Sequence, residues 1–132
     1  MFFDISKTIR YWVDSAVYDL ETGRTLLESK RFPYALFFGH LALEKLLKAL
    51  VVKATKEHAQ YTHSLIFLAS KAKIDISESL LDKLAEFMEF YIEARYPDEK
   101  KDFYSKCTED FARQKFAEIE DVYKWLIQKL EI

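Results

Sequence analysis

Glycine, proline and cysteine are scarce in this chain, whose 132 residues include two glycines, two prolines and one cysteine. A sheet of many strands needs tight turns, which glycine and proline favour, so their scarcity indicates long helices with few connections. The single cysteine, Cys107, cannot form a disulfide within the chain. The cysteine content therefore gives no sign of an oxidising compartment.

Long apolar runs are also lacking. No stretch of about 18 consecutive apolar residues occurs, so we expect no segment to span a membrane. The apolar start, Met1 to Phe3, is interrupted at once by Asp4 and Lys7, which excludes the hydrophobic core of a signal peptide. We therefore expect a cytoplasmic protein that does not associate with membranes.

Asparagine is absent, while lysine and glutamate are frequent, a composition that resembles proteins from hot environments. The formal net charge of -2 excludes a protein built as a whole to coat nucleic acid. Half of the residues are hydrophobic and 16% are aromatic, which excludes intrinsic disorder. A chain of this length and composition can bury one core, so we expect a single domain over residues 1–132.

Apolar residues recur at helical spacing in four long segments and one short one. The long segments cover residues 9–27, 33–56, 77–96 and 108–130, and the short one covers residues 65–72. The segment 33–56 is apolar on nearly all sides and is expected to be the buried central helix, and residues 98–106 are expected to form a charged loop. Ser64 or Thr62, Ser77 and Thr108 are suited to cap helix starts. The sequence thus predicts an all-α fold, an antiparallel up-and-down bundle of four long helices and one short helix.

Four motifs follow one another along this helical pattern. They are Trp12 with Ala16, Asp19 and Leu20; Phe-Pro-Tyr-Ala at 32–35 leading into Ala-Leu-Glu-Lys-Leu-Leu-Lys-Ala at 42–49; Thr-His-Ser-Leu at 62–65; and Ala-Arg-Tyr-Pro at 94–97. In this order the sequence resembles the HEPN domain family, a family of nucleotide-associated helical domains, over residues 12–126.

The resemblance implies a helical bundle that forms homodimers. It also implies a partner, because prokaryotic members are commonly encoded beside a small nucleotidyltransferase as a toxin and antitoxin pair. Catalytic members are metal-independent ribonucleases in which an arginine is followed, about four to six residues later, by a histidine. The histidine can accept the 2′-hydroxyl proton and the arginine can stabilise the developing negative charge on the phosphate.

Arg95 occupies the position of the family's arginine, but Lys100, Lys101 and Asp102 stand where the histidine is expected. Lysine stays protonated near neutral pH unless it is strongly desolvated, so it is a poor substitute for the histidine. The sequence therefore favours a protein that is not an enzyme, and a ribonuclease that uses Arg95 with a base other than histidine remains the alternative. Arg95 itself has two interpretations, a structural ion pair with an acid such as Glu44 or contact with a phosphate.

Other polar residues extend the candidate site. Lys45 and Lys48 can form a small basic patch near Arg95, although Glu44 and Lys48 also have the spacing of an ordinary helix ion pair. His40, within an apolar helix, is expected to be a hydrogen-bonded core histidine. The candidates for phosphate or nucleotide contact are Arg95, Tyr96, Lys45, Lys48 and His63, and Tyr104 is a candidate for modification by a partner nucleotidyltransferase.

The function expected from the sequence is that of a HEPN-like interaction protein, homodimeric, that binds a small nucleotidyltransferase and a nucleotide. A ribonuclease toxin and a stand-alone nucleotide-binding module are the alternatives. Neither a cofactor nor a metal is expected, since no cluster of cysteine, histidine and carboxylate ligands completes a metal site.

Overall fold

A computed structural model describes residues 3–130, so Met1 and Phe2 of the apolar start lie outside it. The described residues form α-helices and short 3₁₀ turns and contain no strand, which confirms the all-α class. In chain order the helices are α1 (Ile5–Glu28), α2 (Phe32–Thr55), α3 (Leu65–Lys71), α4 (Glu78–Phe87), α5 (Pro97–Lys106) and α6 (Glu109–Leu130), with the turns η1 (Met88–Phe90) and η2 (Ile92–Ala94) between α4 and α5.

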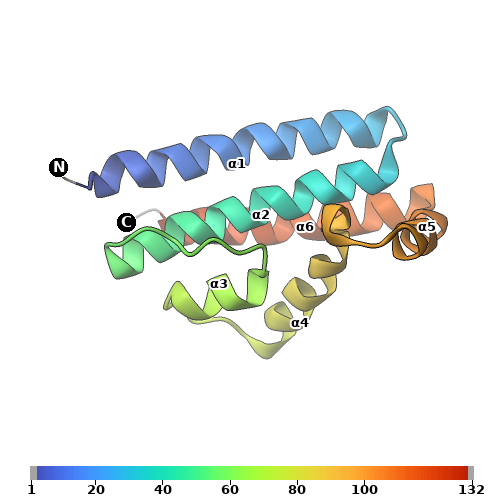
Figure 1. Ribbon diagram of the computed structural model, residues 1–132. Helices are drawn as coiled ribbons and strands as arrows, with labels where there is room; N and C mark the ends of the chain where they lie inside the picture. The colour runs from blue at the N-terminus through green and yellow to red at the C-terminus, as the bar shows by residue number, and fades with distance from the viewer. Residues whose placement is uncertain (1–2, 131–132) are drawn as a thin grey trace.

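The chain runs up and down along one long axis (Figure 1). α1 and α2 form an antiparallel hairpin, and α6 runs in the same direction as α2. Between them, the loop after α2 leads back along the bundle, α3 runs in the direction of α2, and α4 leads back again toward the end where α5 lies, near the α1–α2 connection. This is the expected bundle, except that the long helix expected over residues 77–96 is interrupted by two 3₁₀ turns after α4.

Side chains cap four of the helices and explain where they begin. In each case a side-chain oxygen accepts a hydrogen bond from a backbone N–H three residues later, which satisfies a donor that the helix leaves free. The pairs are Asp4 with Lys7 (3.0 Å), Ser64 with Phe67 (3.1 Å), Ser77 with Leu80 (3.1 Å) and Thr108 with Phe111 (3.2 Å). The caps expected at Ser64, Ser77 and Thr108 are confirmed.

α2 is the central helix, as its composition predicted, and it contacts α1, α3 and α6. Its apolar residues from Ala35 to Val52 are almost all buried. Gly23 of α1 and Gly39 of α2 lie where α6 approaches most closely, since a Cβ at either position would come within 2.8 Å of a side-chain carbon of Phe116 or Ile119. The two glycines therefore allow three long helices to pack tightly together.

Two expectations about residues 77–106 were wrong. The helix that begins after Ser77 ends at Phe87 rather than near Tyr96, because two 3₁₀ turns follow it. Residues 98–106 are not a loop, since α5 occupies them with Pro97 in its first turn, where proline is tolerated. Acidic residues in the first turn of α5 and Lys106 in its last turn favour the helix dipole, and the buried Phe103 anchors it.

No helix within residues 3–130 is long and apolar enough to cross a membrane. This agrees with the lack of long apolar runs in the sequence.

Candidate functional site

Three polar residues occupy one line of the otherwise apolar helix α2. His40, Glu44 and Lys48 are each four residues apart and therefore follow one another along one face of the helix. All three are buried, with exposed fractions of 0%, 3% and 6%. Burial of a charged group is costly unless a partner compensates for it. The groups that contact these three side chains therefore determine whether their burial is stable.

Glu44 is the centre of the buried cluster. One of its carboxylate oxygens, Oε2, lies 3.1 Å from Lys48 Nζ, which confirms the ion pair that the sequence predicted. The other, Oε1, lies 3.0 Å from His63 Nδ1, so the histidine that precedes α3 is tied to the central helix. The carboxylate is therefore satisfied by a lysine one turn away and by a histidine from a loop.

His63 also contacts Tyr91, in the segment between η1 and η2. The two rings are nearly parallel, with centroids 4.1 Å apart, and the Tyr91 hydroxyl lies 2.9 Å from His63 Nε2. Since a carboxylate faces Nδ1, the hydrogen-bond network assigns the imidazole proton to Nδ1 and leaves Nε2 as the acceptor for the Tyr91 hydroxyl. Burial, and after it the nearby Glu44 carboxylate, raises the pKa of Tyr91, so its hydroxyl stays protonated and can donate this bond.

His40 is a core residue, as expected, and a weak hydrogen bond with the backbone of His63 raises its pKa against the larger effect of burial. Neither ring nitrogen has a partner of ordinary hydrogen-bond geometry among the described residues, and Nδ1 lies 3.9 Å from Glu44 Oε1. Burial lowers the pKa of His40 to about 3, because desolvation disfavours the charged imidazolium. His40 is therefore neutral near pH 7.

Lys48 is held by aromatic rings as well as by Glu44. Its Nζ lies 5.0 Å from the centroid of the Trp12 ring and 5.9 Å from that of Tyr61. Both rings can attract the ammonium through their π faces. Lys48 thus joins α1, α2 and the loop before α3, and its charge is already balanced within the protein.

Arg95 and His63 line the same recess, of about 320 Å³, although 31 residues separate them in sequence. Tyr91, Ser64 and Glu99 also line it. Arg95 follows η2 in an extended conformation, and about a third of its side chain is exposed. This recess brings together a cationic side chain, an imidazole and two hydroxyl groups.

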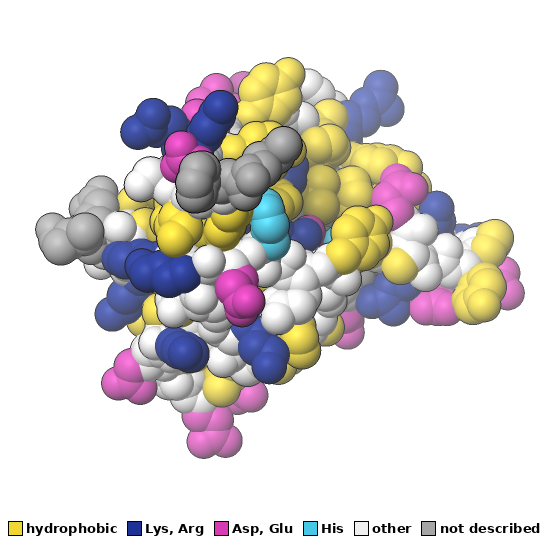
Figure 2. Space-filling view, turned by 60° about the vertical axis from the view of Figure 1, so that its left-hand side comes forward, with side chains coloured by type: hydrophobic (Ala, Val, Ile, Leu, Met, Phe, Trp, Pro, Cys, Tyr) yellow, Lys and Arg dark blue, Asp and Glu magenta, His cyan; other side chains and the backbone are white. Residues whose placement is uncertain are grey.

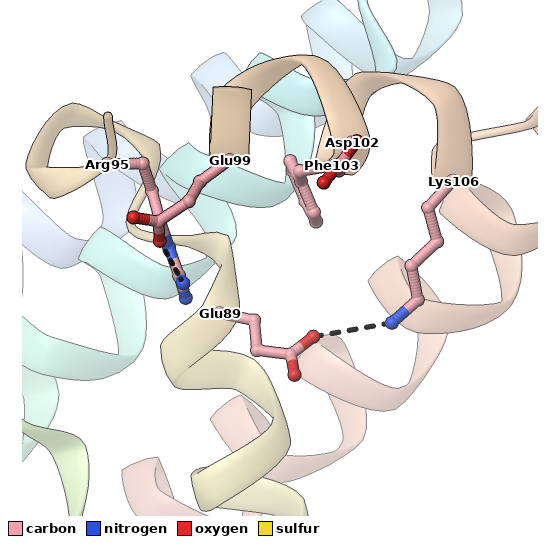
Figure 3. A pocket seen from close by; sticks show the side chains of 6 residues that line it. All are labelled: Glu89, Arg95, Glu99, Asp102, Phe103 and Lys106. Atoms are coloured by element: carbon pink, nitrogen blue, oxygen red, sulfur yellow. Dashed lines mark hydrogen bonds and ion pairs between the residues drawn. The ribbon is translucent and has the colours of Figure 1, made fainter. Parts of the chain in front are cut away.

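Arg95 makes an ion pair with an acid, as one of its two interpretations predicted, although the acid is not Glu44. It does not lie on the long helix expected over residues 77–96, because α4 ends at Phe87. Its guanidinium Nη1 lies 3.2 Å from Glu99 Oε2 on the first turn of α5, rather than against Glu44. Figure 3 shows this pair beside the ion pair of Lys106 with Glu89.

Arg95 also borders a second hollow, of about 260 Å³, whose other charged residues are Glu89, Glu99, Asp102 and Lys106 (Figure 3). Three carboxylates against two cations make this hollow unfavourable for an anion. Of the two hollows that Arg95 borders, the recess on the His63 side is therefore the one better suited to a phosphate.

The remaining candidates from the sequence lie elsewhere. Lys45 Nζ is 2.6 Å from Asp19 Oδ2 of α1, so Lys45 and Lys48 are each paired with their own acid and form no basic patch with Arg95. Tyr96 is largely exposed and does not line the recess. Tyr104 lies on α5, where a hydrogen bond with the Tyr34 side chain, and burial to a lesser extent, raises its pKa to about 12.

The surface charge is mixed. Figure 2 shows Lys and Arg interspersed with Asp and Glu on the face that it views, with hydrophobic side chains gathered over its upper part. Within residues 3–130, no group of three or more histidine, cysteine and acidic side chains is arranged to hold a metal ion. Of the residues that the sequence marked for phosphate contact, His63 and Arg95 line one recess together.

Comparison with known proteins gives the family. The model of the HEPN domain matches residues 9–130. The crystal structure of TT1696 from Thermus thermophilus is similar at a TM-score of 0.76 with 21% identity, covering 92% of this chain and 97% of that one. The structure of ST0689, described as an archaeal HEPN homologue, is similar at 0.71 with 18% identity, covering 93% and 98%. A comparison with curated protein sequences finds no match.

The two structural likenesses show the fold alone, whereas the family match extends over nearly the whole chain. It includes the Thr-His-Ser-Leu and Ala-Arg-Tyr-Pro motifs that supply His63 and Arg95 to the recess. The chain belongs to the HEPN domain family.

Proposed function

We propose that this chain is a HEPN interaction protein that pairs with a small nucleotidyltransferase, binds the phosphate of a nucleotide between Arg95 and His63, and does not cleave RNA. The observation that carries the proposal is the state of His63, both of whose ring nitrogens are engaged, one by Glu44 and one by Tyr91. A general base needs a free acceptor within reach of the substrate. His63 therefore has no free ring nitrogen with which to take a proton, and it forms a fixed wall of the recess while Arg95 supplies the donors to the phosphate.

Phosphate binding is supported by the weakness of the pair that Arg95 now makes. The Arg95–Glu99 pair is partly exposed on both sides, with side-chain exposures of 32% and 48%. Exposed ion pairs of this kind contribute about 0–1 kcal/mol, so an incoming phosphate can replace the carboxylate at small cost. The planar guanidinium then offers two parallel donors to phosphate oxygens.

The absence of ribonuclease activity is supported by the residues after Arg95 as well. In α5 the side chains at the spacing of the family's histidine are Glu99, Lys100, Lys101 and Asp102. None of these titrates near pH 7 in its ordinary state, whereas imidazole does. The chain therefore lacks the proton acceptor that the family reaction places on this helix.

The nucleotidyltransferase partner and the homodimer are proposed from family membership, with support from the surface. Tyr11, Tyr18, Tyr61 and Tyr96 are exposed by 62% to 93%. Exposed tyrosines are enriched where proteins meet, because a ring can be buried while its hydroxyl still finds a partner. Tyr104, exposed by 42%, remains the candidate for modification by that partner.

Nucleotide binding is tested by the shift in melting temperature that ATP, GTP and AMP each produce in the purified protein. A ligand at about 100 times its Kd stabilises the folded state by about 2.7 kcal/mol, which is a measurable shift. Arg95→Ala and His63→Gln should abolish the shift. Arg113→Ala is the matched control, because Arg113 makes an exposed pair with Glu109 four residues away and lies outside the recess. An equal loss in the control would refute the assignment of the site.

Partner binding is tested separately by co-expression with the small nucleotidyltransferase that the proposal expects to be encoded beside this chain. Co-purification of the two proteins in a fixed ratio is the expected result. A nucleotide-induced shift without any co-purification would favour the alternative of a stand-alone nucleotide-binding module. A monomer by sedimentation at tens of micromolar would refute the homodimer.

A ribonuclease is the second candidate, and one observation favours it: the recess supplies Arg95 with a histidine from another element. Its test is incubation of labelled RNA, without metal, with wild type, Arg95→Ala and Tyr91→Phe. We expect no cleavage by the wild type. Cleavage that disappears in Arg95→Ala and rises in Tyr91→Phe, which frees His63 Nε2, would replace the first proposal with the second.

A further inference from the structure

A groove between α4 and α6 lies outside the site described above. It has a volume of about 550 Å³, and its apolar lining consists of Leu80 on α4 with Val122 and Trp125 on α6. No residue of this groove lines the recess of Arg95 and His63. It is therefore a separate surface with its own chemistry.

Carboxylates outnumber cations in the lining of this groove. Asp75, Glu118 and Asp121 line it together with one cation, Lys83. Glu118 is neutralised by Lys83, whose Nζ lies 3.0 Å from it, whereas Asp75 and Asp121 have no ion-pair partner among residues 3–130. Two uncompensated negative charges beside an apolar floor create a potential that attracts cationic groups.

Trp125 adds a preference for cations. The Nζ of Lys129 lies 4.8 Å from the centroid of its ring, so the ring already attracts one ammonium group within the protein. An arriving lysine or arginine can make the same contact or one with the free carboxylates. A ligand that complements the groove must therefore combine an apolar group, which contacts the apolar lining, with positive charge, which pairs with the free carboxylates.

We propose that this groove binds a segment of a partner protein that presents a bulky apolar side chain flanked by lysine or arginine. The apolar side chain packs on Leu80, Val122 and Trp125, and the flanking cations pair with Asp75 and Asp121. Burial of the apolar side chain supplies affinity, about 25 cal/mol for each Å² removed from water, and the charges supply the preference for a basic segment.

The test uses Trp125 fluorescence. The chain has two tryptophans, so the Trp12→Phe variant leaves Trp125 as the only one and a direct reporter of the groove. The probes are a helical peptide of leucine and lysine without aromatic residues, the same peptide with glutamate in place of lysine, and spermine. We expect the leucine–lysine peptide to change the Trp125 emission with a saturating curve, and the glutamate peptide and spermine to leave it unchanged.

Charge reversal then locates the contact. In the Trp12→Phe background, Asp121→Lys and Asp75→Lys should each weaken binding of the leucine–lysine peptide about tenfold, equivalent to about 1.4 kcal/mol. Asp14→Lys is the matched control, since this exposed residue of α1 lies outside the groove and its reversal changes the net charge equally. Unchanged far-UV circular dichroism confirms that each variant folds.

Four outcomes overturn the proposal. Equal binding of the glutamate peptide means that charge plays no part, and equal weakening by Asp14→Lys means that the attraction is general. Saturable binding of spermine means a site for small cations. No binding of the leucine–lysine peptide removes the proposal altogether. Arg95→Ala should not affect peptide binding, so the result is independent of the proposed nucleotide site.

Discussion

Replacing Glu44 by leucine should destabilise the fold strongly, because it leaves a buried positive charge without its partner. The side chains of Glu44 and Lys48 are only 4% and 8% exposed, and their charged atoms are 3.1 Å apart. Removal of one member of a buried ion pair costs about 3–5 kcal/mol. The π faces of Trp12 and Tyr61 near Lys48 Nζ compensate for only part of this loss.

The double variant Glu44→Leu/Lys48→Met should recover most of that stability. It removes both charges and fills the space with apolar groups of similar size, which is often neutral or stabilising. His63 Nδ1 loses its acceptor, but 37% of its side chain is exposed, so water can take the bond. We therefore expect the double variant to lie within about 1 kcal/mol of wild type.

The measurement is urea unfolding followed by circular dichroism for wild type, both single variants and the double variant. The pair Glu109 and Arg113 is the control cycle, because both side chains are nearly half exposed and should couple by less than about 1 kcal/mol. A loss below about 1 kcal/mol for Glu44→Leu alone would refute the argument. So would a double variant that loses as much as the two single variants together.

Three further predictions follow from single residues. Burial lowers the pKa of His40 from 6.5 to about 3, so between these pH values only the unfolded chain takes up the proton. The free energy of unfolding should therefore fall by up to about 1.4 kcal/mol per pH unit from pH 6.5 toward pH 3. His40→Leu should flatten this dependence of the urea midpoint on pH. Lys56, at the C-cap of α2, has φ 61°, so Lys56→Gly should raise the free energy of unfolding by roughly 1 kcal/mol, and a fall would refute the claim of strain. Burial raises the pKa of the Cys107 thiol to about 12, so iodoacetamide should modify it far more slowly in the native protein than in urea at pH 8.

The parts of the fold that the sequence predicted are those governed by local rules. Helical periodicity is unbroken through α1, α2 and α6, and capping hydroxyls mark several starts. The end of α4 was missed because Met88 and Tyr91 keep apolar spacing while the backbone tightens into 3₁₀ turns. α5 was missed because a charged segment with one buried aromatic residue, Phe103, does not show amphipathic periodicity.

The sequence named two of the residues that line the recess but could not give their geometry. His63 and Arg95 were both candidates, yet only the path of α3, α4 and the 3₁₀ turns brings them into one recess. The i, i+4 pair of Glu44 and Lys48 is visible in the sequence, whereas the bond of Glu44 to His63 joins residues 19 apart. Tyr91 was not among the candidates, and no sequence signal connected its hydroxyl with His63.

The bundle does not need the buried charges of Glu44 and Lys48 on α2 for its stability. Apolar residues of similar size at Glu44 and Lys48 would avoid the desolvation of two charges, and most of α2 is already apolar. What Glu44 adds is the orientation of His63, because the carboxylate oxygen that does not pair with Lys48, Oε1, lies 3.0 Å from His63 Nδ1 beside Arg95's recess. The double variant Glu44→Leu/Lys48→Met separates the two roles, since it keeps the fold but releases the imidazole. It should therefore retain its urea midpoint while the nucleotide-induced shift in melting temperature falls, and a full shift in this variant would show that His63 needs no carboxylate to bind.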